Sequence, residues 1–163
     1  MELRMARRDE GFTLIELMVV VVIAVILISL AVPSYMTYVR QSRRTEAKTA
    51  LLDLAGREES YFSTNGSVYT ATAANLGFSA AWNAPFGSGY YQVLVCSPAA
   101  AACNGLAMPN TPAAPSYQVV AIPVATSSQA NDTQCAAFGV DSTGQQYAVT
   151  NAGAANTAYC WAN

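Results

Sequence analysis

The feature that most constrains the fold of this chain is an uninterrupted apolar run near its start. The run covers residues 17–32 and directly follows an acid, Glu16. As a helix that rises about 1.5 Å per residue, residues 12–32 would measure roughly 31 Å, the thickness of the hydrocarbon core of a bilayer. The sequence therefore predicts a transmembrane helix.

Glu16 is the unusual residue of this segment. A carboxylate in lipid costs on the order of 2.5 to 3.5 kcal/mol near the centre of a helix and less near its end. Glu16 is therefore either a functional group or an acid that reaches the headgroups and the positive end of the helix dipole. Position alone leaves both interpretations open.

The helical pattern continues beyond the apolar run. Within residues 47–62, apolar side chains recur at spacings of three, four and seven, which is typical of a helix with one buried face. Asn65-Gly66 is a helix stop signal. Pro33 lies between the two halves, where it would remove a backbone hydrogen bond and kink the helix.

The rest of the chain predicts a small antiparallel β-sheet. β-branched and aromatic residues alternate in part with polar ones, and turn-forming residues separate the runs. The expected fold class is α+β, a long N-terminal α-helix with a transmembrane first half, packed on this sheet. We expect a helical turn at 72–76, strands at 90–96 and 117–124, a hairpin of 135–140 and 145–149, and an irregular tail.

The chain has four cysteines and no histidine, and it lacks the Cys-x-x-Cys pairs typical of zinc sites. No metal is therefore expected. An even number of cysteines in a loop-rich domain that follows a membrane segment favours disulfides and an oxidising compartment over free thiols. Of the three possible pairings we favour Cys96 with Cys103 and Cys135 with Cys160, because each closes a local loop.

The charge distribution limits the function classes. After Ser60 the chain has no Lys or Arg, and its only charged side chains there are Asp132 and Asp141. That part offers no electrostatic footprint for a nucleic acid, and loop-capping roles are expected for the two acids. With no histidine and no carboxylate pair, the chain shows no catalytic arrangement, and neither enzymatic activity nor a cofactor is expected.

Arg40, Arg43, Arg44 and Lys48 form a basic group on the predicted helix. Three interpretations remain open. The group could be a solvated face, it could pair with acids such as Glu46, Glu58 or Glu59 on neighbouring copies, or it could attract anionic headgroups.

The segment Gly11-Phe12-Thr13-Leu14-Ile15-Glu16-Leu17-Met18 follows a short leader with three arginines and precedes Ala31-Val32-Pro33-Ser34-Tyr35. This arrangement resembles the N-terminal signature of type IV pilins. The motifs at residues 43–47, 55–62 and 132–135 and the final Cys160-Trp161 are similar to type IVa pilins of the PilE type.

The resemblance implies that the chain is divided into four parts. Residues 1–11 would be a cleaved leader, 12–33 the transmembrane and assembly half of the helix, 34–63 its amphipathic half, and 64–163 a globular head with disulfides. A prepilin peptidase would cleave between Gly11 and Phe12, and Phe12 would be N-methylated. Glu16 would then neutralise the Phe12 amine of a neighbouring subunit, although a pair within one subunit competes because the two residues are four apart.

The resemblance also implies a function. The chain would be a major or minor structural subunit of a type IV pilus, assembled with other pilins by inner-membrane machinery. The resulting extracellular filament would serve adhesion and twitching motility, with no nucleic acid as partner. Many pilins carry a glycine in the apolar run where this chain has Val25, which leaves helix unwinding between Val25 and Pro33 open.

Four alternatives remain. A pseudopilin of a type II secretion system shares the helix, and a DNA-uptake pilin would need a basic stripe. An ordinary secretory signal could be cleaved after Ser29-Leu30-Ala31, but the helical pattern continues past that point. A membrane-anchored enzyme or ligand sensor would retain residues 1–11.

Overall fold

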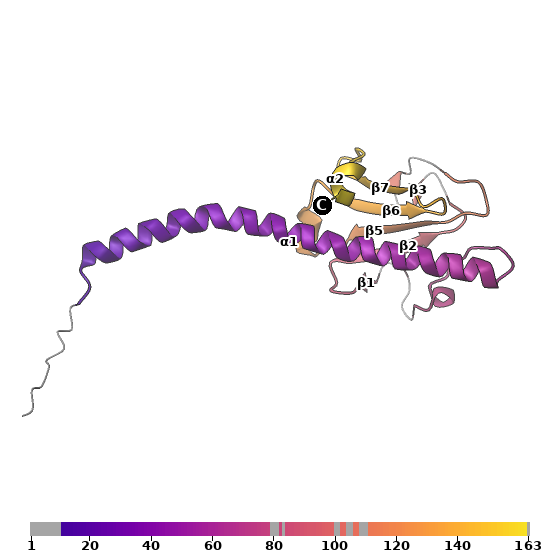
Figure 1. Cartoon of the computed structure of the whole chain (residues 1–163), viewed down its shortest axis with the longest axis horizontal. Coiled ribbons are helices and arrows are strands. Elements are labelled where there is room, and N and C mark those ends of the chain that lie inside the picture. Colours follow the sequence, from indigo (N-terminus) through magenta and orange to yellow (C-terminus); the bar gives the residue numbers. More distant parts are fainter. Residues whose placement is uncertain are drawn as a thin grey trace, which may run out of the picture. The chain divides into compact units, whose positions relative to one another are not determined.

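The computed structural model describes residues 11–78, 82, 84–99, 102–103, 106–107 and 111–162. The chain divides into two compact units between Tyr38 and Val39. The first unit contains the apolar half of helix α1 (Leu14–Thr64), and the second contains the rest of α1 and the sheet (Figure 1). The observed α+β architecture is the one predicted from the sequence.

Local hydrogen bonds define both ends of α1. The Thr13 hydroxyl oxygen accepts the Glu16 backbone N–H at 3.2 Å, which satisfies one of the free amides of the first turn. At the other end, the Ser67 N–H donates to the Phe62 carbonyl at 3.1 Å, and Gly66 has a φ of 72°. This is a left-handed C-cap, and it confirms the predicted stop at Asn65-Gly66.

Pro33 lies inside α1, as expected from the sequence. The Thr37 hydroxyl donates to the Pro33 carbonyl at 3.1 Å. The helix continues without interruption through this position. The kink and the unwinding between Val25 and Pro33 stay predictions.

The second unit is built on a five-stranded antiparallel sheet of order β1-β2-β5-β6-β7. β3 and β4 pair separately. The bounds are β1 (Pro85–Phe86), β2 (Tyr91–Cys96), β3 (Ala102–Cys103), β4 (Leu106–Ala107), β5 (Gln118–Pro123), β6 (Ala137–Asp141) and β7 (Gln146–Val149). Short 3₁₀ helices are η1 (Ala73–Leu76) and η2 (Ser128–Asn131), and the last helix is α2 (Thr157–Ala162).

The predicted strands correspond to β2, β5, β6 and β7, and the predicted turn corresponds to η1. The tail was expected to be irregular, and this was wrong, because α2 forms there. The Thr157 hydroxyl accepts the Ala148 N–H at 3.0 Å, and the Asn156 N–H donates to the Ala148 carbonyl at 2.8 Å. Contact with β7 therefore orders a segment with little helical pattern of its own.

One face of the sheet packs on α1. Ala47, Leu51 and Leu54 are fully buried there, and they contribute to a core with alternate residues of the strands. A smaller cluster on the opposite face contains Leu94, Cys103, Val120, Ala137 and Tyr147. The observed helix face matches the predicted spacing.

Gly139 in β6 lies opposite Tyr147 in β7. A Cβ at position 139 would overlap the Tyr147 ring. The ring lies over the glycine backbone, so this position requires glycine.

Candidate functional site

The apolar half of α1 is exposed along its length. None of its most apolar stretch is buried, and α1 is long and apolar enough to cross a membrane. Phe12 is 84% exposed and Leu30 is 69% exposed. Such a surface must be covered by lipid or by other chains.

Phe12 and Glu16 lie together on this unit. They line one surface hollow of about 240 Å³ with Leu17, Val20 and Val21. Among the described residues, the Glu16 carboxylate has no hydrogen bond or ion pair. The pairing of Glu16 with the Phe12 amine stays a prediction, because cleavage after Gly11 would create that amine.

Arg44 does not belong to a solvated face. Its guanidinium binds Asp132 through two hydrogen bonds of 2.7 and 2.9 Å, and the two side chains are 3% and 2% exposed. Burial by itself would lower the pKa of Arg44, but the hydrogen bonds and the charge of Asp132 raise it above its ordinary value. A buried pair of this kind is held in place by further hydrogen bonds.

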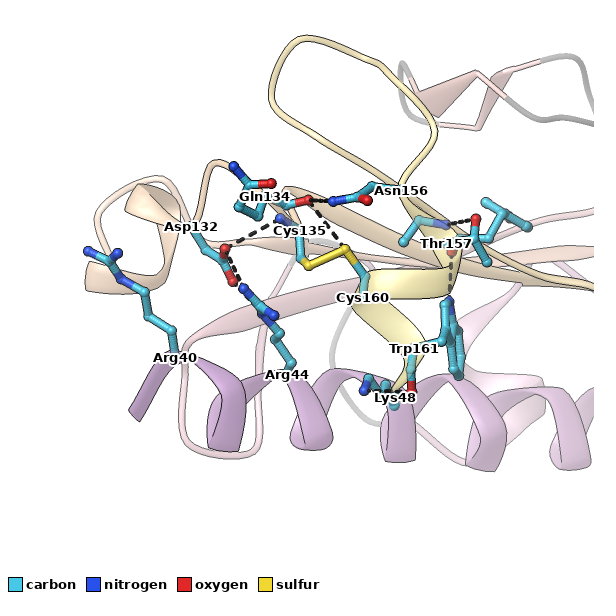
Figure 2. Close-up of a disulfide and its surroundings, with 12 residues drawn as sticks. Arg40, Arg44, Lys48, Asp132, Gln134, Cys135, Asn156, Thr157, Cys160 and Trp161 are labelled. Carbon is cyan, nitrogen blue, oxygen red and sulfur yellow. Dashed lines mark hydrogen bonds and ion pairs between the residues drawn. A yellow bond between two sulfur atoms is a disulfide. The ribbon is translucent and has the colours of Figure 1, made fainter. Parts of the chain in front are cut away.

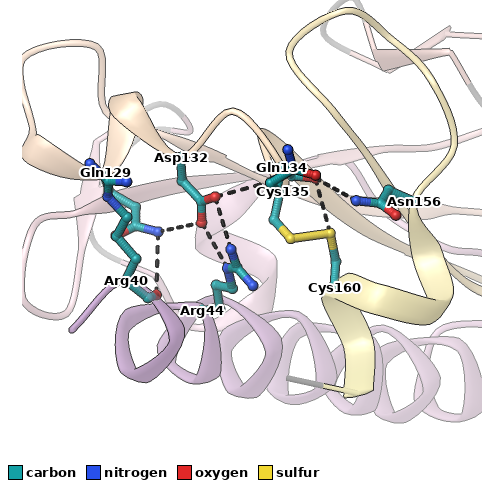
Figure 3. Close-up of polar contacts among 8 residues, drawn as sticks. All are labelled: Arg40, Arg44, Gln129, Asp132, Gln134, Cys135, Asn156 and Cys160. Carbon is teal, nitrogen blue, oxygen red and sulfur yellow. Dashed lines mark hydrogen bonds and ion pairs between the residues drawn. A yellow bond between two sulfur atoms is a disulfide. The ribbon is translucent and has the colours of Figure 1, made fainter. Parts of the chain in front are cut away.

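Asp132 is the centre of that network (Figure 3). The Gln129 side-chain amide donates to its carboxylate at 3.0 Å, and the Cys135 backbone N–H does so at 3.3 Å. Gln129 also donates to the Arg40 carbonyl at 3.4 Å. Residues 129–135 are thereby fastened to α1.

Two other basic residues of the group are also used inside the chain. The Arg43 guanidinium lies 3.8 Å from the centre of the Tyr90 ring and donates to the Ser128 hydroxyl at 2.6 Å. Lys48 donates to the Trp161 carbonyl at 3.1 Å, at the end of α2 (Figure 2). Burial and then the charge of Arg44 lower the pKa of Lys48.

Arg40 differs from the other three. Its guanidinium makes no hydrogen bond or ion pair among the described residues, and its Nε is buried. The idea of a uniformly solvated basic face is therefore wrong. It fails because Arg43, Arg44 and Lys48 connect α1 to segments far away in the sequence.

Glu58, one of the acids considered for contacts between copies, is fully buried. That excludes it as an exposed partner. Its Oε2 accepts the Thr70 N–H at 3.1 Å, while its Oε1 has no partner. Burial raises the pKa of Glu58 to about 7, the Thr70 N–H acts in the opposite direction, and the nearby Glu59 adds to the rise.

The cysteines form the two disulfides favoured from the sequence, Cys96–Cys103 and Cys135–Cys160. The second joins the segment that follows Asp132 to α2, as Figure 2 shows. The Asn156 amide adds a hydrogen bond to the Gln134 carbonyl at 3.0 Å. Residues 132–135 are thus bound to α1 through the Arg44–Asp132 pair and to α2 through the Cys135–Cys160 disulfide.

Sequence reasoning missed Gln129 and the partnership of Arg44 with Asp132. Arg44 and Asp132 are 88 positions apart, and no local pattern connects them. Asp141 was expected to cap a turn, and this is confirmed, since its Oδ1 accepts the Thr143 and Gln145 N–H groups at 2.9 and 3.0 Å. In the described part of the chain, no three His, Cys, Asp or Glu residues gather as a metal site would require.

Two family models match the chain. The model described as Type IV minor pilin ComP, DNA uptake sequence receptor, matches residues 33–139. The model described as Prokaryotic N-terminal methylation motif matches residues 6–32. The first match alone covers more than half of the sequence.

Curated relatives point the same way. Over 71 residues the chain is 42% identical to the Type IV major pilin protein PilA of Myxococcus xanthus. The matched region covers 44% of this chain and 32% of that protein. Over 78 residues it is 38% identical to the Fimbrial protein EcpC of Eikenella corrodens, covering 48% of this chain and 50% of that one. The matches thus span half or less of each relative.

Proposed function

The chain belongs to the type IV pilin family, and on that premise we propose that it is a structural subunit of a type IV pilus. The observation that carries the proposal is the exposed apolar half of α1. Lipid would cover this surface in the inner membrane, and the same helix of other subunits would cover it in an extracellular filament. Adhesion and twitching motility would follow from the filament.

The proposal includes processing of the N-terminus. A prepilin peptidase would remove residues 1–11 by cleaving between Gly11 and Phe12, and Phe12 would be methylated. The methylation-motif match at residues 6–32 supports this step. The mature chain would contain the membrane half 12–33, the amphipathic half 34–63 and the head 64–163.

Glu16 would act during assembly. An ammonium and a carboxylate are each costly in lipid, and pairing the Phe12 amine of one subunit with Glu16 of the next offsets both costs. The hollow that Phe12 and Glu16 share supports a role for this face of the helix.

The variant Glu16→Ala tests the role of Glu16. We expect it to insert into the membrane normally but to disappear from the sheared fibre fraction, because the incoming amine would lack its partner. Immunoblots of the membrane and fibre fractions measure both effects. Glu59→Ala, which removes an exposed acid elsewhere on α1, is the matched control and should assemble. Normal fibre yield in Glu16→Ala would refute the charge-pairing role.

Intact-mass measurement tests the processing. The expected mass is that of residues 12–163 with one added methyl group and two disulfides. An intact Met1 in native material, together with the absence of the chain from polymers, would contradict the proposal. It would favour a membrane-anchored protein of another kind.

A DNA-uptake receptor is the second candidate, because the matching family model carries that description. The charges argue against it. The chain has no Lys or Arg after Arg57, and Arg43, Arg44 and Lys48 are engaged within the chain. Binding driven by phosphate contacts needs exposed cations.

Fluorescence anisotropy with labelled duplex DNA distinguishes the two candidates. We expect no salt-sensitive binding of this chain at physiological ionic strength. Specific binding that weakens as salt is raised would establish the DNA-uptake function instead. A pseudopilin function would be supported by calcium-dependent melting of the head.

A further inference from the structure

A groove of about 570 Å³ runs along the solvent side of α1 in the second unit. Its floor is made of small side chains and of Phe86 from β1, and two carboxylates lie in it. The lining residues are Ser42, Thr45, Glu46, Thr49, Ala50, Asp53 and Phe86. No cation lines the groove, so it suits a positively charged side chain with an apolar stem.

Both carboxylates keep an oxygen for another donor. The Glu46 Oε1 accepts the Ser88 N–H at 2.5 Å, and the Asp53 Oδ2 accepts from Arg57 Nε at 2.8 Å. Within the described residues, no hydrogen bond is made to Glu46 Oε2 or to Asp53 Oδ1. Glu46 also holds the loop at Gly87 and Ser88, and Asp53 is the more exposed of the two acids, its pair with Arg57 lying open to solvent.

Arg40, in the same unit, has a guanidinium that makes no hydrogen bond or ion pair within the described residues, whereas Arg43 and Lys48 are held by uncharged partners. Arg40 projects from α1 toward Gln129 (Figure 3), and its guanidinium is not matched by a carboxylate in the described part of the chain. Arg44 and Arg57, in contrast, are paired with Asp132 and Asp53.

The cation and the groove lie on opposite sides of the helix. At about 100° per residue, Arg40 and Thr49, which are nine positions apart, differ by half a turn. Arg40 therefore cannot reach the groove of its own chain. A contact between two different surfaces of identical chains is heterologous, and when it does not close into a ring it propagates into a filament.

We propose that the groove on α1 receives Arg40 of a second copy of this chain, with Asp53 as its principal ionic partner and Glu46 as the second. This inference rests on the proposed function and specifies one subunit contact within the filament. The charges are complementary, and the small residues of the groove allow close approach of the incoming arginine stem.

Charge reversal in the full-length chain tests the contact. Arg40→Glu and Asp53→Arg should each lower fibre yield about tenfold, because each places like charges at every copy of the contact. The double variant restores opposite charges and should return the yield to within about threefold of the wild type. Asp53 and Arg57 form an exposed pair, so Asp53→Arg has little effect on folding, which thermal melts of the single variants verify.

Arg40→Glu combined with Glu59→Lys is the matched control. Glu59 is an exposed acid of α1 that does not line the groove. This pair of changes should not restore assembly. Equal recovery in the control, or normal fibres in Arg40→Glu alone, would overturn the contact while leaving the pilus function intact.

Zero-length cross-linking gives an independent measurement. In fibres of Arg40→Lys, a carbodiimide should join position 40 to Asp53 or Glu46, and mass spectrometry identifies the linked peptides. The link must be between copies, because the two positions lie on opposite sides of one helix. Cross-links from position 40 only to another protein, or to other acids of this chain, would overturn the inference. A wild-type chain absent from fibres would overturn the function and the contact together.

Discussion

The carboxyl group of Glu58 is fully buried beside the loop that follows α1. Burial raises its pKa from 4.5 to about 7, so between these pH values the folded chain holds a proton that the unfolded chain has released. The stability associated with Glu58 is therefore complete below pH 4.5, falls as the pH rises, and levels off above 7.

The variant Glu58→Gln should abolish this pH dependence. Glutamine keeps an acceptor for the Thr70 N–H but does not titrate. The free energy of unfolding of the wild type should fall relative to the variant by up to about 3 kcal/mol between pH 4.5 and 7. Denaturant titrations across that range measure the difference. Glu59→Gln removes an exposed charge that contributes less than burial to the raised pKa of Glu58, so it should keep most of the slope. An unchanged slope in Glu58→Gln would show that this carboxyl is not responsible.

At the scale of elements, α1 has two different environments along one helix. Its first half exposes apolar side chains on all sides, whereas its second half buries one stripe against the sheet. The C-terminal segment is held to that second half by Arg44, Lys48 and the Cys135–Cys160 disulfide.

Removing the two disulfides separately should have unequal effects. In the chain-entropy model, the sequence separations of 7 and 25 correspond to about 2.5 kcal/mol for Cys96–Cys103 and about 3.5 kcal/mol for Cys135–Cys160. Replacing both cysteines of the longer loop by serine should therefore lower the melting temperature more, as measured by circular dichroism. A larger loss of melting temperature on removal of Cys96–Cys103 would show that local packing outweighs loop length.

At the scale of the whole molecule, all buried residues of both hydrophobic clusters belong to the unit that begins at Val39. A fragment of residues 39–163 should therefore fold, form both disulfides and stay monomeric in aqueous buffer, while the full chain needs detergent or lipid. Size-exclusion chromatography and circular dichroism test this. Aggregation or unfolding of the fragment would mean that residues before Val39 also stabilise the sheet.

Local patterns were sufficient for several features of this chain. Residues close together in the sequence were enough to predict the apolar run, the buried stripe within residues 47–62, the helix stop at Asn65-Gly66 and most of the strands. Disulfide pairing was also accessible, because Cys96 and Cys103 close a short loop. Periodicity and turn chemistry act over a few residues, so they can be read without a structure.

Other features depended on contacts between distant residues. No local sequence pattern indicates that Arg44 is buried against Asp132 or Glu58 against Thr70. Nor does one indicate that α2 forms on β7. The tertiary structure alone also showed that the Arg40 guanidinium makes no hydrogen bond or ion pair among the described residues, whereas Arg43, Arg44 and Lys48 are all engaged. A charged residue in the sequence has no assigned partner, and only the folded chain determines which charges are neutralised inside and which face outward.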